Sequence, residues 1–219
     1  MFILNSMTPK PITIRPEMAV DKAVELLNAK DFRHLPVVDE ENRLIGVVTD
    51  RDLRSAGPST MLSGEERKRV LAQVRGTLIR EIMSTDFVTL QPASTLDDAL
   101  LLFKSRSIGA IPVVDGKDRV VGIFSINDLM GAYRRLFGLG EKGSVLVAIE
   151  DDGDPQALSR LVQLLEKHKI VFTRLIRAER QGREPAMLYV RMNTMNIRSV
   201  HRIVEEAGFT VHTPTLDQD

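Results

Sequence analysis

An internal repeat dominates this sequence: residues 7–53 align with residues 83–129 at a constant offset of 76 positions and without a gap. Fourteen of the 47 aligned pairs are identical, including the run Pro-Val-Val-Asp at 36–39 and 112–115 and the pair Gly46/Gly122. A unit of this length is too small to hold a core alone. We therefore expect the two copies to pack face to face about a pseudo-twofold axis.

Each repeat has the same predicted order of elements. An extended piece ending in proline (13–16 and 89–92) precedes an amphipathic helix with apolar residues at i, i+3, i+4 and i+7. These residues are Val20, Ala23, Val24 and Leu27 in the first copy and Leu96, Ala99, Leu100 and Phe103 in the second. Two β-branched runs around a polar turn then predict hairpins at 35–38/44–48 and 111–114/120–124. A second helix begins at 49–52 or 125–128, and a helical linker at 54–82, with a helix beginning at Ser63, joins the repeats.

The pattern changes after residue 137. Three glycines within 138–143 predict a linker between a domain at 1–137 and a domain at 144–219. They also match the dinucleotide pattern G-x-G-x-x-G, but they follow a helix and precede a strand, the reverse of the order that pyrophosphate binding requires. The second domain is predicted to have strands at 145–149, 170–178, 187–192 and 209–212, a hairpin turn at 181–184, and helices at about 155–168 and 197–207. Gly208 supplies the end of the last helix. This βαββαβ order predicts a ferredoxin-like sheet with two helices on one face, so the fold class is α/β with an α+β tail.

Composition excludes several classes of function. The 30 basic and 30 acidic residues balance, so the chain lacks the global positive field that non-specific nucleic-acid or membrane binding uses. The absence of cysteine excludes disulfides, thiolate nucleophiles and Cys-ligated metals. The sequence contains no P-loop and no G-x-S-x-G motif, and its four histidines lack metal-ligand spacing. Because these catalytic motifs are missing, we expect that the protein is not an enzyme. With no signal-peptide pattern and no apolar run of about 18 residues, we also expect it to be cytoplasmic.

The stretches 49–52 (Thr-Asp-Arg-Asp) and 125–128 (Ser-Ile-Asn-Asp) allow two interpretations. A hydroxyl residue followed three positions later by an acidic residue is a capping box, which satisfies free N–H groups at a helix start. The same groups can bind a nucleotide, because the helix N-terminus and the hydroxyl suit phosphate and the carboxylate accepts from ribose hydroxyls. Gly46 and Gly122 would then let a ligand approach the backbone. Both interpretations predict the motif in both repeats, so spacing leaves both open.

The strings around 32–39 and 44–52, with their second copies at 108–115 and 120–128, resemble a tandem pair of CBS domains, a Bateman module, over about residues 7–133. The tail resembles an ACT-type domain, and the combination is similar to the AcuB group of acetoin-utilization proteins. The resemblance implies a regulatory protein that binds AMP, ADP, ATP or S-adenosylmethionine between its repeats. It also implies a homodimer formed through the CBS pair.

The resemblance further implies that Thr49 and Ser125 face phosphate and that Asp52 and Asp128 hold the ribose. Residues that precede or include the strand proline would line the adenine slot, and the early extended piece would supply an apolar wall. The implied site residues are Ile14, His34, Leu35, Pro36, Thr49, Arg51, Asp52, Leu90, Ala110, Ile111, Pro112, Ser125, Asn127 and Asp128. Arg51 can reach a phosphate whereas its counterpart Asn127 is neutral, so we expect the first site to take the more highly charged ligand.

Two alternatives remain open at this point. ACT-type domains often bind an amino acid at a D-x-P-G-x-L-like loop, and residues 152–158 resemble this loop with Gln156 in place of the glycine. The competing interpretation is a solvated acidic turn that caps the following helix at Asp154. The whole protein could also be a structural or oligomerisation module with empty clefts that acts through protein contacts. Adenylate binding that is lost on changing Asp52 or Asp128 to alanine separates this module from a ligand sensor.

Overall fold

The computed structural model of the chain describes residues 1–30, 33–56, 76–179, 186–194 and 196–212. Contacts divide it into two compact units, Met1–Ala132 and Tyr133–Asp219. The division falls inside helix α6 (Ile126–Phe137), whereas the glycine pattern places it after residue 137. Among the described helices, none is long and apolar enough to cross a membrane.

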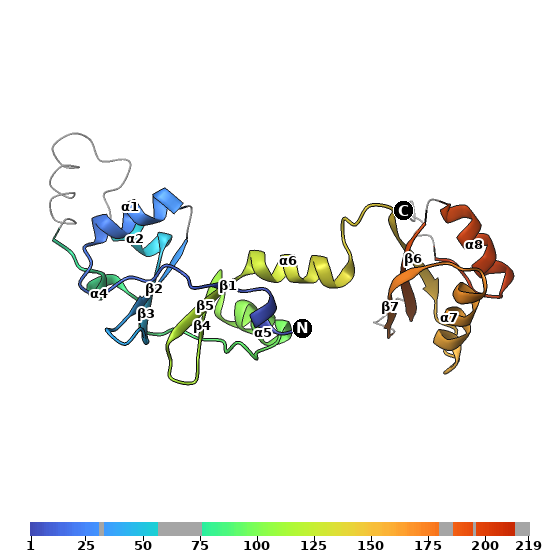
Figure 1. Ribbon diagram of the computed structural model, residues 1–219, viewed down its shortest axis with the longest axis horizontal. Coiled ribbons are helices and arrows are strands. Elements are labelled where there is room, and N and C mark those ends of the chain that lie inside the picture. The colour runs from blue at the N-terminus through green and yellow to red at the C-terminus, as the bar shows by residue number, and fades with distance from the viewer. Residues whose placement is uncertain (31–32, 57–75, 180–185, 195, 213–219) are drawn as a thin grey trace, which may run out of the picture. The chain divides into compact units, whose positions relative to one another are not determined.

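The first unit contains both repeats with the expected order of elements (Figure 1). The first repeat consists of α1 (Val20–Lys30), β2 (His34–Val38), β3 (Leu44–Thr49) and α2 (Asp50–Ala56). The second consists of α5 (Leu96–Arg106), β4 (Ala110–Val114), β5 (Val120–Ser125) and α6. The helix expected to begin at Ser63 lies outside the described residues, which resume shortly before the short helix α4 (Ile79–Ile82).

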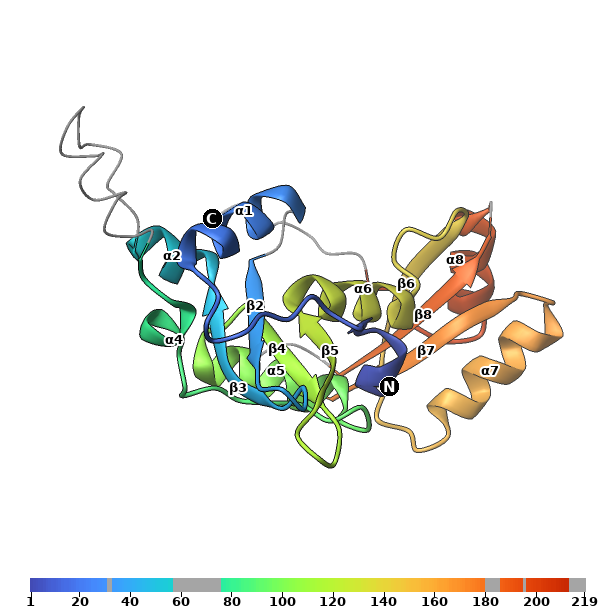
Figure 2. The same ribbon diagram turned by 60° about the vertical axis from the view of Figure 1, so that its left-hand side comes forward.

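Each repeat is built on an antiparallel hairpin with a third extended piece beside it. In the first repeat β2 pairs with β3 from His34↔Thr49 to Val38↔Leu44, and the second repeat has the equivalent register. The extended pieces at 13–16 and 89–92, each of which ends in proline, pair in parallel with the first strand of each hairpin. Each forms a single bridge, at Ile14 and at Leu90. In the first repeat α1 and α2 cover one face of the hairpin (Figures 1 and 2). Its core comprises Ile14, Val20, Ala23, Leu27, Leu35, Val37, Val48, Leu53 and Ile79.

The two hairpins meet at their turns about a pseudo-twofold axis. The Leu44 N–H donates to the Asp118 carbonyl and the Val120 N–H donates to the Asn42 carbonyl, both at 3.0 Å. These two bonds are related by the 76-residue shift, so each repeat gives the other the same contact. Beneath them lies a shared buried cluster of Val38, Leu44, Val114 and Val120.

The segment that leads into each repeat packs on the other repeat. The N-terminal segment comprises the 3₁₀ helix η1 (Ile3–Asn5) and strand β1 (Thr8–Pro9), and β1 pairs with β5. Its counterpart, residues 79–84, packs on the first repeat and bridges Val47 through Ser84. The Ile3 N–H donates to the Ser94 carbonyl (2.8 Å), and the equivalent Ile79 N–H donates to the Met18 carbonyl (2.9 Å). Each repeat therefore completes its structure with residues that precede its partner.

These crossed segments correct one expectation from the sequence. Gly46 and Gly122 were expected to admit a ligand to the backbone, but methionines from the crossed segments occupy that space. A Cβ built on Gly46 would lie 2.7 Å from the Met83 Sδ, and one on Gly122 would lie 2.5 Å from the Met7 Sδ. A periodicity argument could not find this contact, because it joins residues more than 35 positions apart.

The second unit contains β6 (Ser144–Glu150), α7 (Ala157–Lys167), β7 (Phe172–Ala178), β8 (Met187–Asn193) and α8 (Ile197–Glu206). Its antiparallel sheet has the order β6-β8-β7, and Val211 bridges Ile149 on the free side of β6. This is the order of a ferredoxin-like βαββαβ sheet, with both helices on one face. The core comprises Val147, Ile149, Ala157, Leu161, Leu165, Leu188, Val190, Met192, Val200, Val204 and Phe209.

Details at both ends of this unit differ from the predicted boundaries. The last strand is a single bridge with hydrogen bonds on either side of it, not a strand over 209–212. Helix α7 begins at Ala157, because Asp154 accepts from the Gln156 N–H (2.8 Å) and so holds a turn ahead of the helix. Gly208 does follow the last helix in the left-handed conformation, with φ of 87°.

The last turn of α6 belongs to the second unit, where one arginine holds it. Arg174 on β7 donates from Nε to the Leu136 carbonyl (3.0 Å) and from Nη2 to the Arg135 carbonyl (2.9 Å). Its guanidinium also forms a bidentate ion pair with Glu141, with both N–O distances at 2.9 Å. A cation at a helix C-terminus satisfies carbonyls that lack an intrahelical partner.

Candidate functional site

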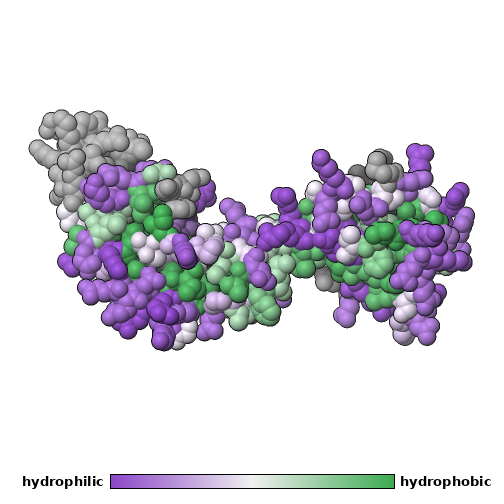
Figure 3. Space-filling model, viewed as in Figure 1, coloured by the Kyte–Doolittle hydropathy of each residue, from purple (hydrophilic) through white to green (hydrophobic). Residues whose placement is uncertain are grey.

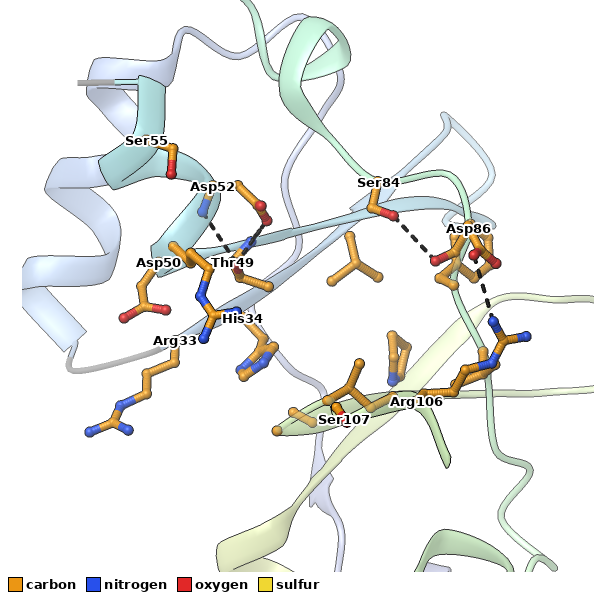
Figure 4. A pocket seen from close by; sticks show the side chains of 18 of the residues that line it. Arg33, His34, Thr49, Asp50, Asp52, Ser55, Ser84, Asp86, Arg106 and Ser107 are labelled. Carbon is orange, nitrogen blue, oxygen red and sulfur yellow. Dashed lines mark hydrogen bonds and ion pairs between the residues drawn. The ribbon is translucent and has the colours of Figure 1, made fainter. Parts of the chain in front are cut away.

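A cavity of about 840 Å³ lies in the first unit and is lined by both repeats (Figure 4). Strands β2 and β3 and helix α2 supply one side, and the opposite side comes from residues 84–88 and 106–112. The lining residues are Arg33, His34, Val47, Thr49, Asp50, Arg51, Asp52, Arg54, Ser55, Ser84, Asp86, Phe87, Val88, Arg106, Ser107, Ile108, Gly109, Ala110 and Pro112. A ligand held here would contact both repeats at once.

Thr49 and Asp52 form a capping box at the start of α2, on the wall of the cavity. The Thr49 N–H and hydroxyl both donate to Asp52 Oδ2, at 2.8 and 2.7 Å. The Asp52 N–H donates back to Thr49 Oγ1 at 3.3 Å. Among the described residues no donor contacts Asp52 Oδ1, so this carboxylate keeps one oxygen for a further hydrogen bond.

The second copy of the motif forms the same box at the start of α6. The Ser125 N–H and hydroxyl donate to Asp128 Oδ2 at 2.8 and 2.7 Å, and the Asp128 N–H donates to Ser125 Oγ at 3.2 Å. Both motifs therefore cap helices, whatever further role they have. Ser125, Asn127 and Asp128 do not line the 840 Å³ cavity.

His34 stands where the two repeats approach each other. It pairs with Thr49 in the hairpin register and is half-buried. A Cβ on Gly109, in the second repeat, would lie 3.1 Å from the His34 Cε1, so any side chain at that position would crowd the imidazole. Burial lowers the pKa of His34 below its ordinary value; Asp50 opposes this shift, Arg33 adds to it, and Asp52 also opposes it.

The charges on the cavity wall are only partly paired. Arg54 forms an ion pair with Asp50. At the opposite end of the cavity, the Arg106 Nη1 lies 3.6 Å from the Asp86 Oδ2 (Figure 4). Within the part of the chain that the structure describes, Arg33 and Arg51 form no hydrogen bond or ion pair through their guanidinium groups. They leave two positive charges available to an anionic ligand.

The structure brings six of the fourteen implied site residues together in this cavity: His34, Thr49, Arg51, Asp52, Ala110 and Pro112. Ile14, Leu35, Leu90 and Ile111 are buried in the cores of the repeats, and Pro36 is buried in β2. The part of the lining at 106–112 corresponds to residues 30–36 of the first repeat, and residues 31–32 of that stretch lie outside the described residues.

Sequence reasoning missed the wall formed by residues 84–88 and 106–109. Asp86 and Phe87 follow the crossed segment at 79–84, and Ser107 follows α5 in a left-handed conformation with φ of 52°. The repeat itself carried a signal for this wall. His34 aligns with Ala110, so the residues before Ala110 could have been expected to face the same space as the residues around His34. Among the described residues, no group of three or more His, Asp or Glu side chains is placed to hold a metal ion.

The family model for the CBS domain matches residues 3–59 and 79–135. A CBS domain-containing protein of Dictyostelium discoideum is 35% identical over 130 residues, which is 59% of this chain and 89% of that protein. Other relatives are longer; the chain spans 23% of the inosine-5'-monophosphate dehydrogenase of Aquifex aeolicus.

Solved structures that resemble this chain are also CBS-domain proteins. A candidate acetoin utilization protein (AcuB) from Vibrio cholerae has a TM-score of 0.53 and 29% identity, covering 65% of this chain and 96% of that one. CBSX2 in complex with AMP has a TM-score of 0.53 and 26% identity, covering 62% and 98%. CBSX2 is a protein of Arabidopsis thaliana. The CBS domain pair of protein MJ0100, in complex with 5'-methylthioadenosine and S-adenosyl-L-methionine, has a TM-score of 0.50 and 29% identity, covering 63% and 96%.

The matched region makes up nearly all of the AcuB and CBSX2 chains, so this protein resembles CBS proteins without an attached catalytic domain. The repeat, the crossed segments and the shared cavity all fall within the residues that match the family model. The chain belongs to the CBS-domain family, and its first unit is a tandem CBS pair.

Proposed function

We propose that this protein is a non-catalytic sensor that binds an adenosine-containing ligand in the cavity between its CBS repeats. The observation that carries the proposal is the Asp52 carboxylate, which lies on the wall of a cavity that both repeats line and has one oxygen without a donor among the described residues. The ligands of CBSX2 and MJ0100 support the ligand class, because both structures hold adenosine compounds.

The cavity supplies a partner for each part of a nucleotide. Asp52 Oδ1 accepts from a ribose hydroxyl, and the apolar side chains of Ala110 and Pro112 lie on the opposite wall for the base. Arg51 supplies a cation for a phosphate. Thr49 has a single hydroxyl hydrogen, so it must turn this hydrogen from Asp52 to the ligand in order to donate to phosphate.

Regulation would follow from a shift in the population of two arrangements of the repeats. A ligand that contacts both repeats stabilises the arrangement that it fits better, and it shifts the equilibrium only by its difference in affinity. The second motif, Ser125 to Asp128, would form a cleft of lower positive charge, because Asn127 replaces Arg51. The first cavity would accordingly take the more highly charged ligand.

We expect a homodimer formed through the CBS pair and an ACT-type role for the second unit, which has the matching strand order. The likeness to AcuB suggests a place in acetoin or carbon metabolism. Gln156 and the pairing of Asp152 with Arg160 (2.5 Å) favour a structural role for the loop at 152–158 over amino-acid binding.

One observation favours the alternative of a structural module. Both capping boxes are complete without any ligand, so both motifs already have a structural role. A structural module would leave the cavity empty in the presence of any adenosine compound. Binding experiments therefore separate the two functions.

The test is thermal unfolding of the pure protein with AMP, ADP, ATP, S-adenosylmethionine and NAD, using Asp52→Ala and Asp128→Ala as a matched pair. A ligand at about 100 times its dissociation constant adds roughly 2.7 kcal/mol, which raises Tm by about 5 to 10 °C in a chain of this size. Each variant loses a cap of about 1 kcal/mol, so the ligand-induced shift is compared and not the Tm itself. A shift that Asp52→Ala abolishes supports the sensor. The absence of a shift with all five compounds contradicts it, and nucleotide turnover during incubation contradicts the non-catalytic assignment.

A further inference from the structure

Arg191 on β8 has the smallest exposed fraction of any charged residue in the described part of the chain, 8%. Its Nη1 donates to the Ser144 Oγ at 3.2 Å. Within the described residues the Arg191 guanidinium makes no other hydrogen bond and no ion pair. A guanidinium carries N–H donors on all three of its nitrogens, so most of these donors have no protein acceptor here.

Other charges of the second unit that are withdrawn from solvent have partners of opposite charge. The Asp151 side chain is 1% exposed, and it accepts from the Arg177 Nε (2.5 Å) and Nη2 (3.2 Å). Arg174, which is next to Arg191 in the register of β7 and β8, pairs with Glu141. A buried charge without a counter-charge is costly, because it loses hydration and gains no ion pair. Among the described residues Arg191 has no such counter-charge.

The Arg191 side chain lies on the face of the sheet that the helices leave open. Val190 and Met192, on either side of Arg191, belong to the core beneath the helices. Because successive side chains of a strand point to opposite faces, Arg191 points away from that core. Leu146 is opposite Arg191 in the register of β6 and β8, and it lies on the same open face.

The segment that precedes β6 packs on the stem of Arg191. A Cβ on Gly138 would lie 3.0 Å from the Arg191 Cδ, and Ser144, which begins β6, accepts from the guanidinium. The surface of the second unit carries apolar side chains between hydrophilic ones (Figure 3). Leu146 is one of the apolar ones and is 47% exposed. An unpaired cation, a hydroxyl and an exposed apolar side chain therefore lie together at this end of the sheet.

The charges around this end of the sheet are mainly positive. Residues 134–144 include Arg134, Arg135 and Lys142 but a single acidic residue, Glu141, whose charge is taken up by Arg174. The acidic stretch at 150–154 lies at the opposite end of β6. The local field at Arg191 therefore favours an anion.

We propose that Arg191 and Ser144 bind the carboxylate of a small organic acid whose apolar body lies against Leu146. The planar guanidinium can donate two parallel hydrogen bonds to a carboxylate, and the Ser144 hydroxyl can donate its own hydrogen as well. One unpaired cation matches one negative charge, and Leu146 favours an acid with an apolar body over inorganic phosphate. This site is separate from the cavity between the CBS repeats and from the loop at 152–158, which lies at the other end of β6.

The test is a titration of the ¹⁵N-labelled full chain with isovalerate, followed through its amide chemical shifts. Isovalerate has one carboxylate on a branched apolar body, and isovaleramide is its uncharged counterpart. We expect isovalerate to shift the amide signals of residues 144, 146 and 191 until they saturate, and to leave those of residues 49–52 in place. Isovaleramide should shift none of them. Equal shifts with isovaleramide, or shifts with isovalerate that do not saturate, overturn the proposal.

Substitutions of Arg191 assign the binding to its guanidinium. Arg191→Met keeps an apolar stem and should weaken isovalerate binding about tenfold or more, the effect of losing a hydrogen bond to a charged group. Arg191→Lys keeps the charge without the planar fork and should lose less. Arg198→Met, at an exposed position of α8, is the matched control and should leave binding unchanged. Full binding by Arg191→Met overturns the proposal.

Thermal unfolding without any acid separates a binding role of Arg191 from a structural one. Replacing an unpaired buried charge by an apolar side chain of similar volume is often neutral or stabilising. Arg191→Met should therefore leave the Tm of the free protein unchanged or raise it, although it weakens isovalerate binding. A clear fall in Tm would show that the charge of Arg191 already stabilises the fold, and it overturns the proposal.

Discussion

Met83 lies against the bare backbone of Gly46, so closely that any side chain on Gly46 would displace it. The contact links the first repeat to a segment that precedes the second, and Met7 and Gly122 repeat it on the other side. Gly46→Ala should therefore destabilise the protein by about 1 to 3 kcal/mol, the usual effect of overpacking a buried contact.

Gly116→Ala is the control for this substitution, because no atom lies within 4 Å of a Cβ at that position. It should change the free energy of unfolding little. In a Met83→Ala background the contact is gone, so Gly46→Ala should have a smaller effect there. Equal effects of Gly46→Ala in both backgrounds, measured by chemical denaturation, would show that Met83 is not the cause.

His34 should make stability depend on pH. Burial lowers its pKa in the folded protein below 6.5, so the folded state binds this proton less tightly than the unfolded chain does. The stabilisation is complete above the unfolded pKa and is lost as the pH falls through 6.5 towards the folded pKa. The difference in Tm between wild type and His34→Gln should change in this window, measured between about pH 7.5 and 5.5. Parallel profiles for the two proteins would contradict this assignment.

Arg51 should discriminate among ligands by charge. Arg51→Asn installs the residue of the second motif and removes one cation from the cavity wall. We expect the affinity for ATP to fall about tenfold, because a hydrogen bond to a charged group contributes about 1.5 kcal/mol or more. The affinity for adenosine, which has no phosphate, should stay the same in calorimetric titration. Arg202→Asn, on the exposed face of α8, should affect neither ligand; an equal loss for both ligands in Arg51→Asn would argue against a phosphate contact.

Arg174 should hold the last turn of α6. Arg174→Met removes two hydrogen bonds to the carbonyls of residues 135 and 136 and the ion pair with Glu141. We expect a loss of about 2 kcal/mol in the stability of the second unit. Hydrogen exchange at residues 138 and 139 should become faster, since these amides donate to the carbonyls of residues 135 and 134 in the turn that Arg174 holds. Unchanged exchange there would mean that the turn is held by other contacts.

The main helices and hairpin strands of both units were predictable from the sequence because each carries a local signal, whereas η1 and β1 were not predicted. The hairpin strands were predicted within one residue of their ends, since β-branched runs and polar turns determine them locally. The strand expected at 209–212 is reduced to a bridge at Val211 with one hydrogen bond on either side of it.

The cavity was only partly predictable. The motif residues Thr49 and Asp52 carry a local signal, as does the strand start at His34, and all three line the cavity. Asp86 and Arg106 carry no such signal: Asp86 follows the crossed segment at 79–84, and Arg106 ends α5 in the second repeat. That crossing is a long-range contact between Ser84 and Val47, which hydrophobic periodicity does not report.

The crossed segments also set the order in which the chain can fold. The first repeat lacks its partner for Val47 until residue 84 has left the ribosome, although its own hairpin is finished by residue 49. The N-terminal segment, in turn, is made first and waits for β5 before it can pair. Neither half is complete when synthesised alone, so the two repeats should fold in one cooperative step late in translation. A gene cut between them should yield two fragments that fold only together.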